Sequence, residues 1–227
     1  KENKKDRLSP EYELLDTGIF EEDRYFDCYI EYAKADVNDI LLKITVYNRG
    51  PETATIHVLP HIWFRNFWRH NPRFTKPEIS SLNGHCLQTS SERNGQFYFY
   101  HQGGEQVFCD NETNNERMYN RPNETPFVKD GINNYVVDKA ATVNLQKKGT
   151  KAAVWLKERI LPGEPASFQI RLSKKQLEDP WVDFDLVFEE RQTETDYYYD
   201  KLAPKKLSPA QKTLLRSAAG GLMWTKQ

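Results

Sequence analysis

Alternating apolar and polar residues predict two β-strands between Asn38 and Asn66. One face of the first strand carries Ile40, Leu42, Ile44 and Val46, which is the period of a half-buried strand. The turn Asn48-Arg49-Gly50-Pro51 follows, because Asn and Gly tolerate left-handed backbone angles and Pro51 has no amide hydrogen to donate. Residues 54–58 alternate again, and Pro60 should end or bulge that strand. The pattern therefore predicts a hairpin at the centre of a sheet.

Similar alternation predicts further strands before and after this hairpin. They are expected at residues 11–20, 25–33, 96–101 and 106–109. The strand at 25–33 should pair with the central hairpin, and the Gly103-Gly104 turn should pair the two strands that flank it. Residues 150–173 predict a second hairpin that turns at Pro162-Gly163. Residues 66–91 and 110–125 have no clear period, which predicts two long loops.

Near the C-terminus helical spacing replaces alternation. Residues 184–199 predict a helix with a glutamate-rich polar side. Ser208 and Pro209 supply an N-cap and a first-turn proline for a second helix that reaches Trp224. The charged residues 1–7 are expected to stay solvated. We therefore predict a mainly β domain at residues 1–178 and a helical segment at residues 179–227.

Charge and hydropathy narrow the possible partners. The 227 residues include 32 Lys and Arg against 33 Asp and Glu, a formal net charge of -1, so electrostatics gives no reason to expect nucleic acid or an anionic membrane as partner. No run of about 18 apolar residues and no signal peptide is present in the sequence, which predicts no membrane span. Aromatic residues make up 13% of the chain, which suits both a sandwich core and a carbohydrate-facing surface.

Three cysteines, Cys28, Cys86 and Cys109, are an odd number without C-x-x-C spacing. This argues against a disulfide framework and a zinc knuckle, and it predicts a reducing compartment, the cytoplasm. Asn111 and Asn123 each begin an Asn-Glu-Thr triplet that would accept a glycan in a secreted protein, but such triplets also arise by chance in Asn-rich loops.

Histidine spacing and short motifs exclude several kinds of chemistry. His57 and His61 are four residues apart and His85 adjoins Cys86, yet no spacing fixes a third ligand, so ordinary polar histidines are favoured and no metal site is predicted. Glycine-rich phosphate loops and a G-x-S-x-G elbow are absent from the sequence. No cofactor is therefore expected.

Two stretches carry candidate substrate-binding residues. Arg65 and Trp68 lie in a dense mixture of aromatic and polar residues, where rings could stack on sugars, although a core role for the rings is the plainer alternative. Lys129, Asp130 and Asn133 surround Gly131, so their side chains are expected to project from a loop tip. The alternative for Asp130 is that it only caps its own turn.

Five blocks of the sequence resemble one known family. They are ELLDTGIFEEDRYFDCYIEYAKAD, ITVYNRGPETATIHVLPHIWFRNFW, FVKDGINNYVVD, GTKAAVWLKERILPG and GGLMWTKQ. In content and order they resemble the N-terminal region of bacterial and fungal glycoside hydrolases in the family of processing α-glucosidase I and mannosylglycerate hydrolase. The chain differs from that pattern at Asn134, where the family carries Asp, and at Asp138-Lys139, where it carries His-Gly.

The resemblance implies a β-super-sandwich followed by linker helices that lead into a catalytic (α/α) barrel beyond Gln227. An Asp/Glu pair in such a barrel hydrolyses α-glucosidic or α-mannosidic bonds with inversion, so this chain alone is expected to be inactive. Its carbohydrate substrate would be met through the barrel, with Lys129, Asp130 and Asn133 helping to close the pocket. Without a barrel, Leu214, Ala218, Leu222 and Trp224 would expose an apolar stripe that self-associates. The alternative is a free-standing carbohydrate- or protein-binding β-sandwich.

Overall fold

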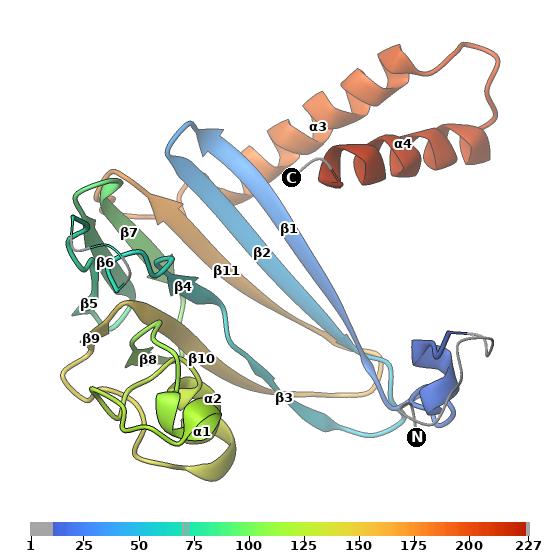
Figure 1. Ribbon diagram of the computed structural model, residues 1–227. Helices are drawn as coiled ribbons and strands as arrows, with labels where there is room; N and C mark the ends of the chain where they lie inside the picture. Colours follow the sequence, from blue (N-terminus) through green and yellow to red (C-terminus); the bar gives the residue numbers. More distant parts are fainter. Residues whose placement is uncertain (1–10, 70, 72, 226–227) are drawn as a thin grey trace.

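The protein is mainly β, with two antiparallel sheets packed face to face and a helical arm (Figure 1). A computed structural model describes residues 11–69, 71 and 73–225, so the charged segment 1–7 and both outer ends of the expected domains lie outside the described residues. A 3₁₀ helix, η2 (Leu14–Thr17), stands where the sequence predicted a strand at residues 11–20. Gly18 ends it with a left-handed φ of 71°, which alternation cannot reveal.

The larger sheet has the strand order β1-β2-β11-β7-β6-β5-β9 within the described residues. Its strands are β1 (Phe26–Asp36), β2 (Asp39–Asn48), β5 (Glu78–Asn83), β6 (Cys86–Ser91), β7 (Gly95–His101), β9 (Lys148–Gly149) and β11 (Pro165–Ser173). The predicted pairing of the strand at 25–33 with the strand after it is confirmed, since Ile30 lies opposite Ile44. The pair β5 and β6 occupies part of residues 66–91, which the sequence predicted to be a loop. A short apolar segment around Leu82 to Leu87 is the only trace of these strands in the sequence pattern.

The smaller sheet is built around one long strand, β10 (Lys151–Ile160). In the part of the chain that is described, β10 pairs with β3 (Ala54–Val58), β4 (His61–Trp63) and β8 (Glu105–Cys109). β3 and β4 follow one another along one edge of β10, with Pro60 between them, so the predicted interruption at Pro60 is confirmed.

All three hairpins predicted from the sequence are wrong in their pairing, although their strands are right. β2 pairs with β1 and β11, whereas β3 pairs with β10 in the other sheet. Likewise β10 and β11 lie in different sheets, and so do β7 and β8. Each of these turns carries the chain from one layer to the other. Strands on either side of such a crossing bury alternate residues in the same core. Their alternation of apolar and polar residues is therefore the same as in the two strands of a hairpin.

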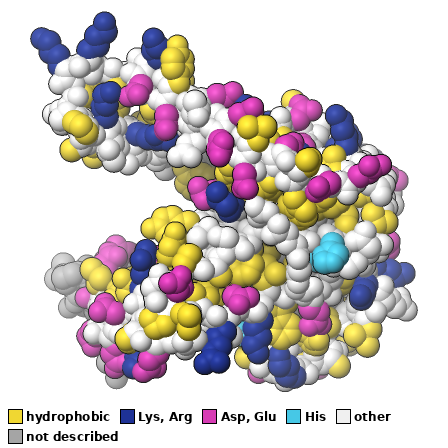
Figure 2. Space-filling model, turned by 180° about the vertical axis from the view of Figure 1, so that it is seen from behind, with side chains coloured by type: hydrophobic (Ala, Val, Ile, Leu, Met, Phe, Trp, Pro, Cys, Tyr) yellow, Lys and Arg dark blue, Asp and Glu magenta, His cyan; other side chains and the backbone are white. Residues whose placement is uncertain are grey.

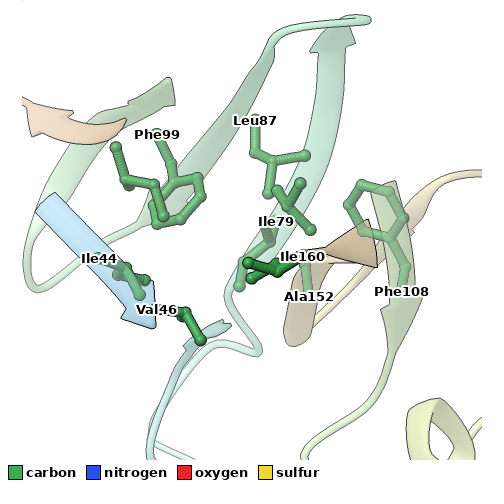
Figure 3. Close-up of a cluster of buried hydrophobic side chains, with 10 residues drawn as sticks. Ile44, Val46, Ile79, Leu87, Phe99, Phe108, Ala152 and Ile160 are labelled. Carbon is green, nitrogen blue, oxygen red and sulfur yellow. The ribbon is translucent and has the colours of Figure 1, made fainter. Parts of the chain in front are cut away.

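The main core lies between the sheets (Figure 3). The larger sheet contributes Ile44, Val46, Ile79, Leu87, Phe99 and Ile170, and the smaller sheet contributes Phe108, Ala152, Val154 and Ile160. Phe108 is fully buried, and burying an aromatic side chain of that size stabilises the fold by roughly 2–3 kcal/mol. The predicted core face of the first strand is therefore confirmed at Ile44 and Val46.

Helices cover the outer face of each sheet. α2 (Gly131–Asp138) packs Ile132 on the smaller sheet, against Val107, Cys109, Val143 and Ala153. The first turn of α3 (Phe184–Leu202) packs Phe184 on the larger sheet, against Leu41 and Ala33. Leu41 is fully buried there. It lies on the face of β2 opposite Ile44 and Val46, so near Leu41 both faces of β2 are covered.

Arg171 fastens α3 to the sandwich. From β11 its guanidinium donates to Asp39 at 2.9 and 2.7 Å, to Asp183 just before α3, and to the Pro180 carbonyl at 2.9 Å. The residue is 4% exposed, so the charge is paired on several sides where water is excluded. The start of the helical arm is therefore rigidly held.

The helical arm consists of α3 and α4 (Pro209–Trp224) and stands away from the sheets (Figures 1 and 2). Ser208 accepts a hydrogen bond from the Gln211 amide, which confirms the predicted N-cap. The two helices are joined by ion pairs of Arg216 with Asp196 and of Lys212 with Asp200. Of the residues described in α4, none is buried. The expected domain boundary at 178/179 falls between the end of β11 and the start of α3.

Candidate functional site

The predicted site residues fall in one polar assembly, the loop cluster, formed by residues 64–69, 110–117 and 123–133. It includes the start of the short helix α1 (Asn115–Tyr119), which lies in a segment that the sequence predicted to be a loop. It also includes the start of α2, where the sequence predicted a loop tip. Asn111 begins the assembly, because its side-chain amide donates to the Phe64 carbonyl at 2.9 Å while the Asn66 side chain donates back to the Asn111 carbonyl at 3.0 Å.

Glu112 is the buried carboxylate that joins the parts of the loop cluster. Its carboxylate accepts from the Trp68 indole nitrogen and from the Arg69 guanidinium, each at 2.8 Å, and its carbonyl accepts from the Lys129 amide at 3.0 Å. Burial raises the pKa of Glu112, but these hydrogen bonds outweigh it and hold the pKa below its usual value. The carboxylate therefore stays ionised, and it serves as an acceptor rather than as a proton donor.

Asp130 is held by side chains and does not cap its own helix. Its carboxylate accepts from the Asn114 amide at 3.1 and 3.2 Å and from Arg117 at 3.2 Å, and it makes no cap hydrogen bond to α2. Asn114 in turn caps α1 by accepting from the Arg117 amide at 3.1 Å. Asp130 thus connects the starts of two helices, and neither a free loop tip nor a self-capped turn describes it.

Gly131 is required by packing, since a Cβ atom there would lie 2.3 Å from the Thr142 carbonyl oxygen. It is buried and opens α2, and the predicted turn is present just before it, at Lys129-Asp130, where the Gly131 amide donates to the Val128 carbonyl at 2.7 Å. The Thr142 hydroxyl donates to the Gly131 carbonyl at 2.7 Å and fixes the contact. A close backbone approach, which the sequence does not display, explains this glycine.

The structure brings some predicted residues together and leaves others apart. Trp68, Lys129 and Asp130 meet around Glu112 and Asn114, whereas Arg65 is exposed and stacks on Phe67 at 5.0 Å. The Lys129 side chain is exposed and reaches the Thr113 hydroxyl at only 3.5 Å. Asn133 is exposed as well. Arg65, Lys129 and Asn133 are therefore the predicted site residues whose polar groups are exposed and accessible to a ligand.

Sequence reasoning missed Glu112 and Asn114. Both stand in a stretch without hydrophobic period, so no pattern marks one carboxylate as buried and its neighbours as exposed. The Asn-Glu-Thr triplets were the available signal. Asn123, from the second triplet, donates to Asn114 at 3.0 Å, and Arg69 binds Glu124 at 3.2 Å as well as Glu112. The side-chain amides of both triplet asparagines are thus engaged inside the protein.

His57, His61 and the buried cysteines Cys86 and Cys109 are engaged within the fold. His57 accepts from the Trp155 indole at 3.1 Å, and the His61 ring lies 2.6 Å from the Leu59 carbonyl. Burial raises the pKa of Cys86 to about 11 and that of Cys109 to about 12. Across the described ranges, no three His, Cys, Asp or Glu residues cluster in a way that could hold a metal ion. No described helix has the length and apolar character needed to cross a membrane.

Fold and loop cluster together define a β-sandwich with a helical arm. No family model matches the chain. The chain is similar to the uncharacterized protein YMR196W of Saccharomyces cerevisiae, with 28% identity over 265 aligned residues. The alignment covers 96% of this chain and 24% of the yeast protein, so the chain spans about a quarter of the length of the relative that it matches.

Proposed function

We propose that this chain is a non-catalytic β-sandwich region of an inverting glycoside hydrolase that acts on α-glucosidic or α-mannosidic bonds. The helical arm carries the proposal. Leu214 and Leu222 are each 70% exposed and Trp224 is 71% exposed, on a helix that packs on neither sheet. Large apolar side chains so placed favour further protein contacts, and more helices of an (α/α) barrel would cover them.

Two further observations support the proposal. The relative is about four times as long as the matched region, which leaves room for a barrel in that protein. Glu112 and Asp130, two carboxylates of the loop cluster that are not exposed, are both occupied by donors, so they do not form the open pair that inverting hydrolysis needs. A free-standing binding module would have no use for the exposed stripe on α4.

The loop cluster lies far from the helical arm, at the opposite end of the molecule (Figure 1). A barrel that begins with α4 must therefore extend along the sandwich before it meets Lys129 and Asn133. Pocket closure by these residues remains a separate prediction. The support of the barrel through the arm does not depend on it.

The experiment compares this chain with a longer protein, the full-length yeast relative. We expect the longer protein to release β-configured sugar from an α-glucoside or α-mannoside, followed by proton NMR, and the chain alone to release none. Hydrolysis by the chain alone, or none by the longer protein on either substrate, would overturn the proposal. Sedimentation of the chain should also show self-association that a Leu222→Glu change reduces, whereas Lys205→Glu should leave it unchanged.

A further inference from the structure

A groove of ≈ 780 Å³ lies at the end of the larger sheet, apart from the loop cluster. Its walls come from the turn between β5 and β6 (residues 83–86), the end of β7 (residues 100–102) and the segment before α3 (residues 177–181). Cavities of about 300–1,000 Å³ are the size that holds small ligands. Because residues 177–181 lead directly into α3, the groove lies at the base of the helical arm.

Buried hydrogen bonds hold the floor of the groove. His101 is 1% exposed, and its ring nitrogens bond the Gly103 carbonyl at 2.7 Å and the Gln106 amide at 2.9 Å. The Gln106 amide also donates to the Asn83 carbonyl at 2.8 Å. Across the groove, the Tyr100 hydroxyl accepts from the Leu177 amide at 2.7 Å. All three walls are thus tied together, and the groove is formed before any ligand arrives.

Exposed polar side chains line this fixed frame. Within the described part of the chain, the His85 imidazole and the Glu178 carboxylate make no hydrogen bond. The same holds for the side-chain nitrogen of Asn83, whose oxygen accepts from the His85 amide at 2.8 Å. Imidazole, carboxylate and amide groups together supply donors and acceptors that suit neighbouring hydroxyls. Trp181, half-buried in the wall, adds aromatic surface.

Charge selects among hydroxyl-rich ligands. The lining includes Glu178 and Asp179 but no Lys or Arg among the described residues, so an anionic ligand would be repelled. We propose that the groove binds a neutral, α-linked hexose oligosaccharide, as an accessory subsite beside the barrel. This inference rests on the proposed function for the linkage of the sugar. The groove's own chemistry supports the neutral, hydroxyl-rich class.

Gly84 offers a test that leaves the frame intact. A Cβ atom there would meet nothing within 4 Å, and the residue has no left-handed φ. Alanine should therefore be tolerated, whereas the ring of phenylalanine would occupy the groove. His85→Ala is a second variant, because its imidazole makes no hydrogen bond in the described structure and its loss should not unfold the chain.

The experiment titrates the ¹⁵N-labelled chain with maltotriose and with an α-linked mannotriose. We expect amide shifts in residues 83–86 and 177–181 with a Kd of about 0.1–10 mM for at least one sugar. Gly84→Ala should keep that affinity within about twofold, while Gly84→Phe and His85→Ala should weaken it at least about tenfold and about threefold, respectively. Circular dichroism checks that each variant is folded.

Three results would overturn the inference: no shifts with either sugar, shifts that map elsewhere, or unchanged affinity in a folded Gly84→Phe or His85→Ala variant. Spermidine binding in place of both sugars would assign the groove to cations instead. Hydrolysis by the longer protein is read separately. If hydrolysis is absent while sugar binding persists, the proposed function fails and the groove stands. If binding is absent while hydrolysis persists, only the groove proposal fails.

Discussion

The side-chain amide of Asn48 donates to the main-chain carbonyl of Ile160 at 3.0 Å, and this bond joins the two sheets at their shared corner. Asn48 ends β2 in the larger sheet, and Ile160 ends β10 in the smaller one. The main chain of Asn48 also bonds Gly163 and Glu164, at 2.8 and 3.2 Å. One asparagine thus fixes two of the places where the chain crosses between layers, from β2 to β3 and from β10 to β11.

Asn48→Ala should lower the free energy of unfolding by about 2–4 kcal/mol, because it leaves the Ile160 carbonyl and the Gly50 amide without their partner. Urea unfolding measures this. Asn38→Ala is the matched control: Asn38 is exposed with no side-chain hydrogen bond in the described structure, so its loss should cost no more than about 0.5 kcal/mol. Equal effects of the two changes would contradict the role of Asn48.

Arg171→Lys should loosen the base of the helical arm. Lysine cannot reproduce the paired hydrogen bonds of the guanidinium to Asp39 and Asp183. The free energy of unfolding should therefore fall by about 2–4 kcal/mol. Hydrogen exchange should quicken in the first turn of α3, at Phe184–Val187. Arg159→Lys, at an exposed position of β10, should change neither measurement. Unaltered exchange in the Arg171→Lys protein would show that the arm is held by other contacts.

Glu112→Gln should flatten the acid limb of stability. A carboxyl whose folded pKa is lowered contributes its full stabilisation above its unfolded pKa, about 4.3, and loses it as the pH falls through the folded value. When the pH is lowered past about 4.3, the melting temperature of the unchanged protein should therefore decrease. The melting temperature of Glu112→Gln should decrease less over the same pH range. Glu116→Gln, at an exposed position, should keep the original profile. If the melting temperature of Glu112→Gln still decreased as steeply at low pH, the acid sensitivity would be due to other carboxyl groups.

Asp130→Ala and Lys129→Ala should separate stability from substrate binding in the loop cluster. Asp130→Ala removes the acceptor of Asn114 and Arg117, so we expect a loss of about 1–2 kcal/mol in the chain alone. Lys129→Ala removes an exposed ammonium and should leave the melting temperature unchanged. In a longer protein that contains this chain, a lower kcat/KM for Lys129→Ala would support pocket closure by this residue. Normal kinetics in both variants would confine the cluster to a structural role.

Local pattern identified many of the strands and the two long helices, but it missed β5, β6 and α1 and did not reveal which strands pair. The alternation of Ile44 and Val46 correctly marks the core face of β2, and Ser208 correctly marks the start of α4. Gly50-Pro51 and Pro162-Gly163 predict hairpin turns, because turn chemistry is the same whether the chain reverses within a sheet or crosses to another. The deciding contacts involve Asn48, which is distant in sequence from Ile160.

The candidate site was predictable only where side chains are polar beside a conspicuous glycine. Lys129 and Asp130 lie beside Glu112 and Asn114, yet the reason for Gly131 is the Thr142 carbonyl, which sequence spacing cannot indicate. Glu112 escaped notice because burial of a single carboxylate depends on Trp68 and Arg69 folding over it. Such contacts arise from tertiary packing of irregular segments, where no period exists to read.

The position of β11 sets a limit on the order in which the chain can fold during synthesis. This strand lies between β2 and β7, so β1 and β2 are joined to the remainder of the larger sheet only when residues 165–173 are in place. Until those residues leave the ribosome, the β2 edge stays unpaired and its apolar face is uncovered, which exposes the nascent chain to misassociation. Because so many pairings join distant residues, refolding should also be slow, in milliseconds to seconds rather than microseconds.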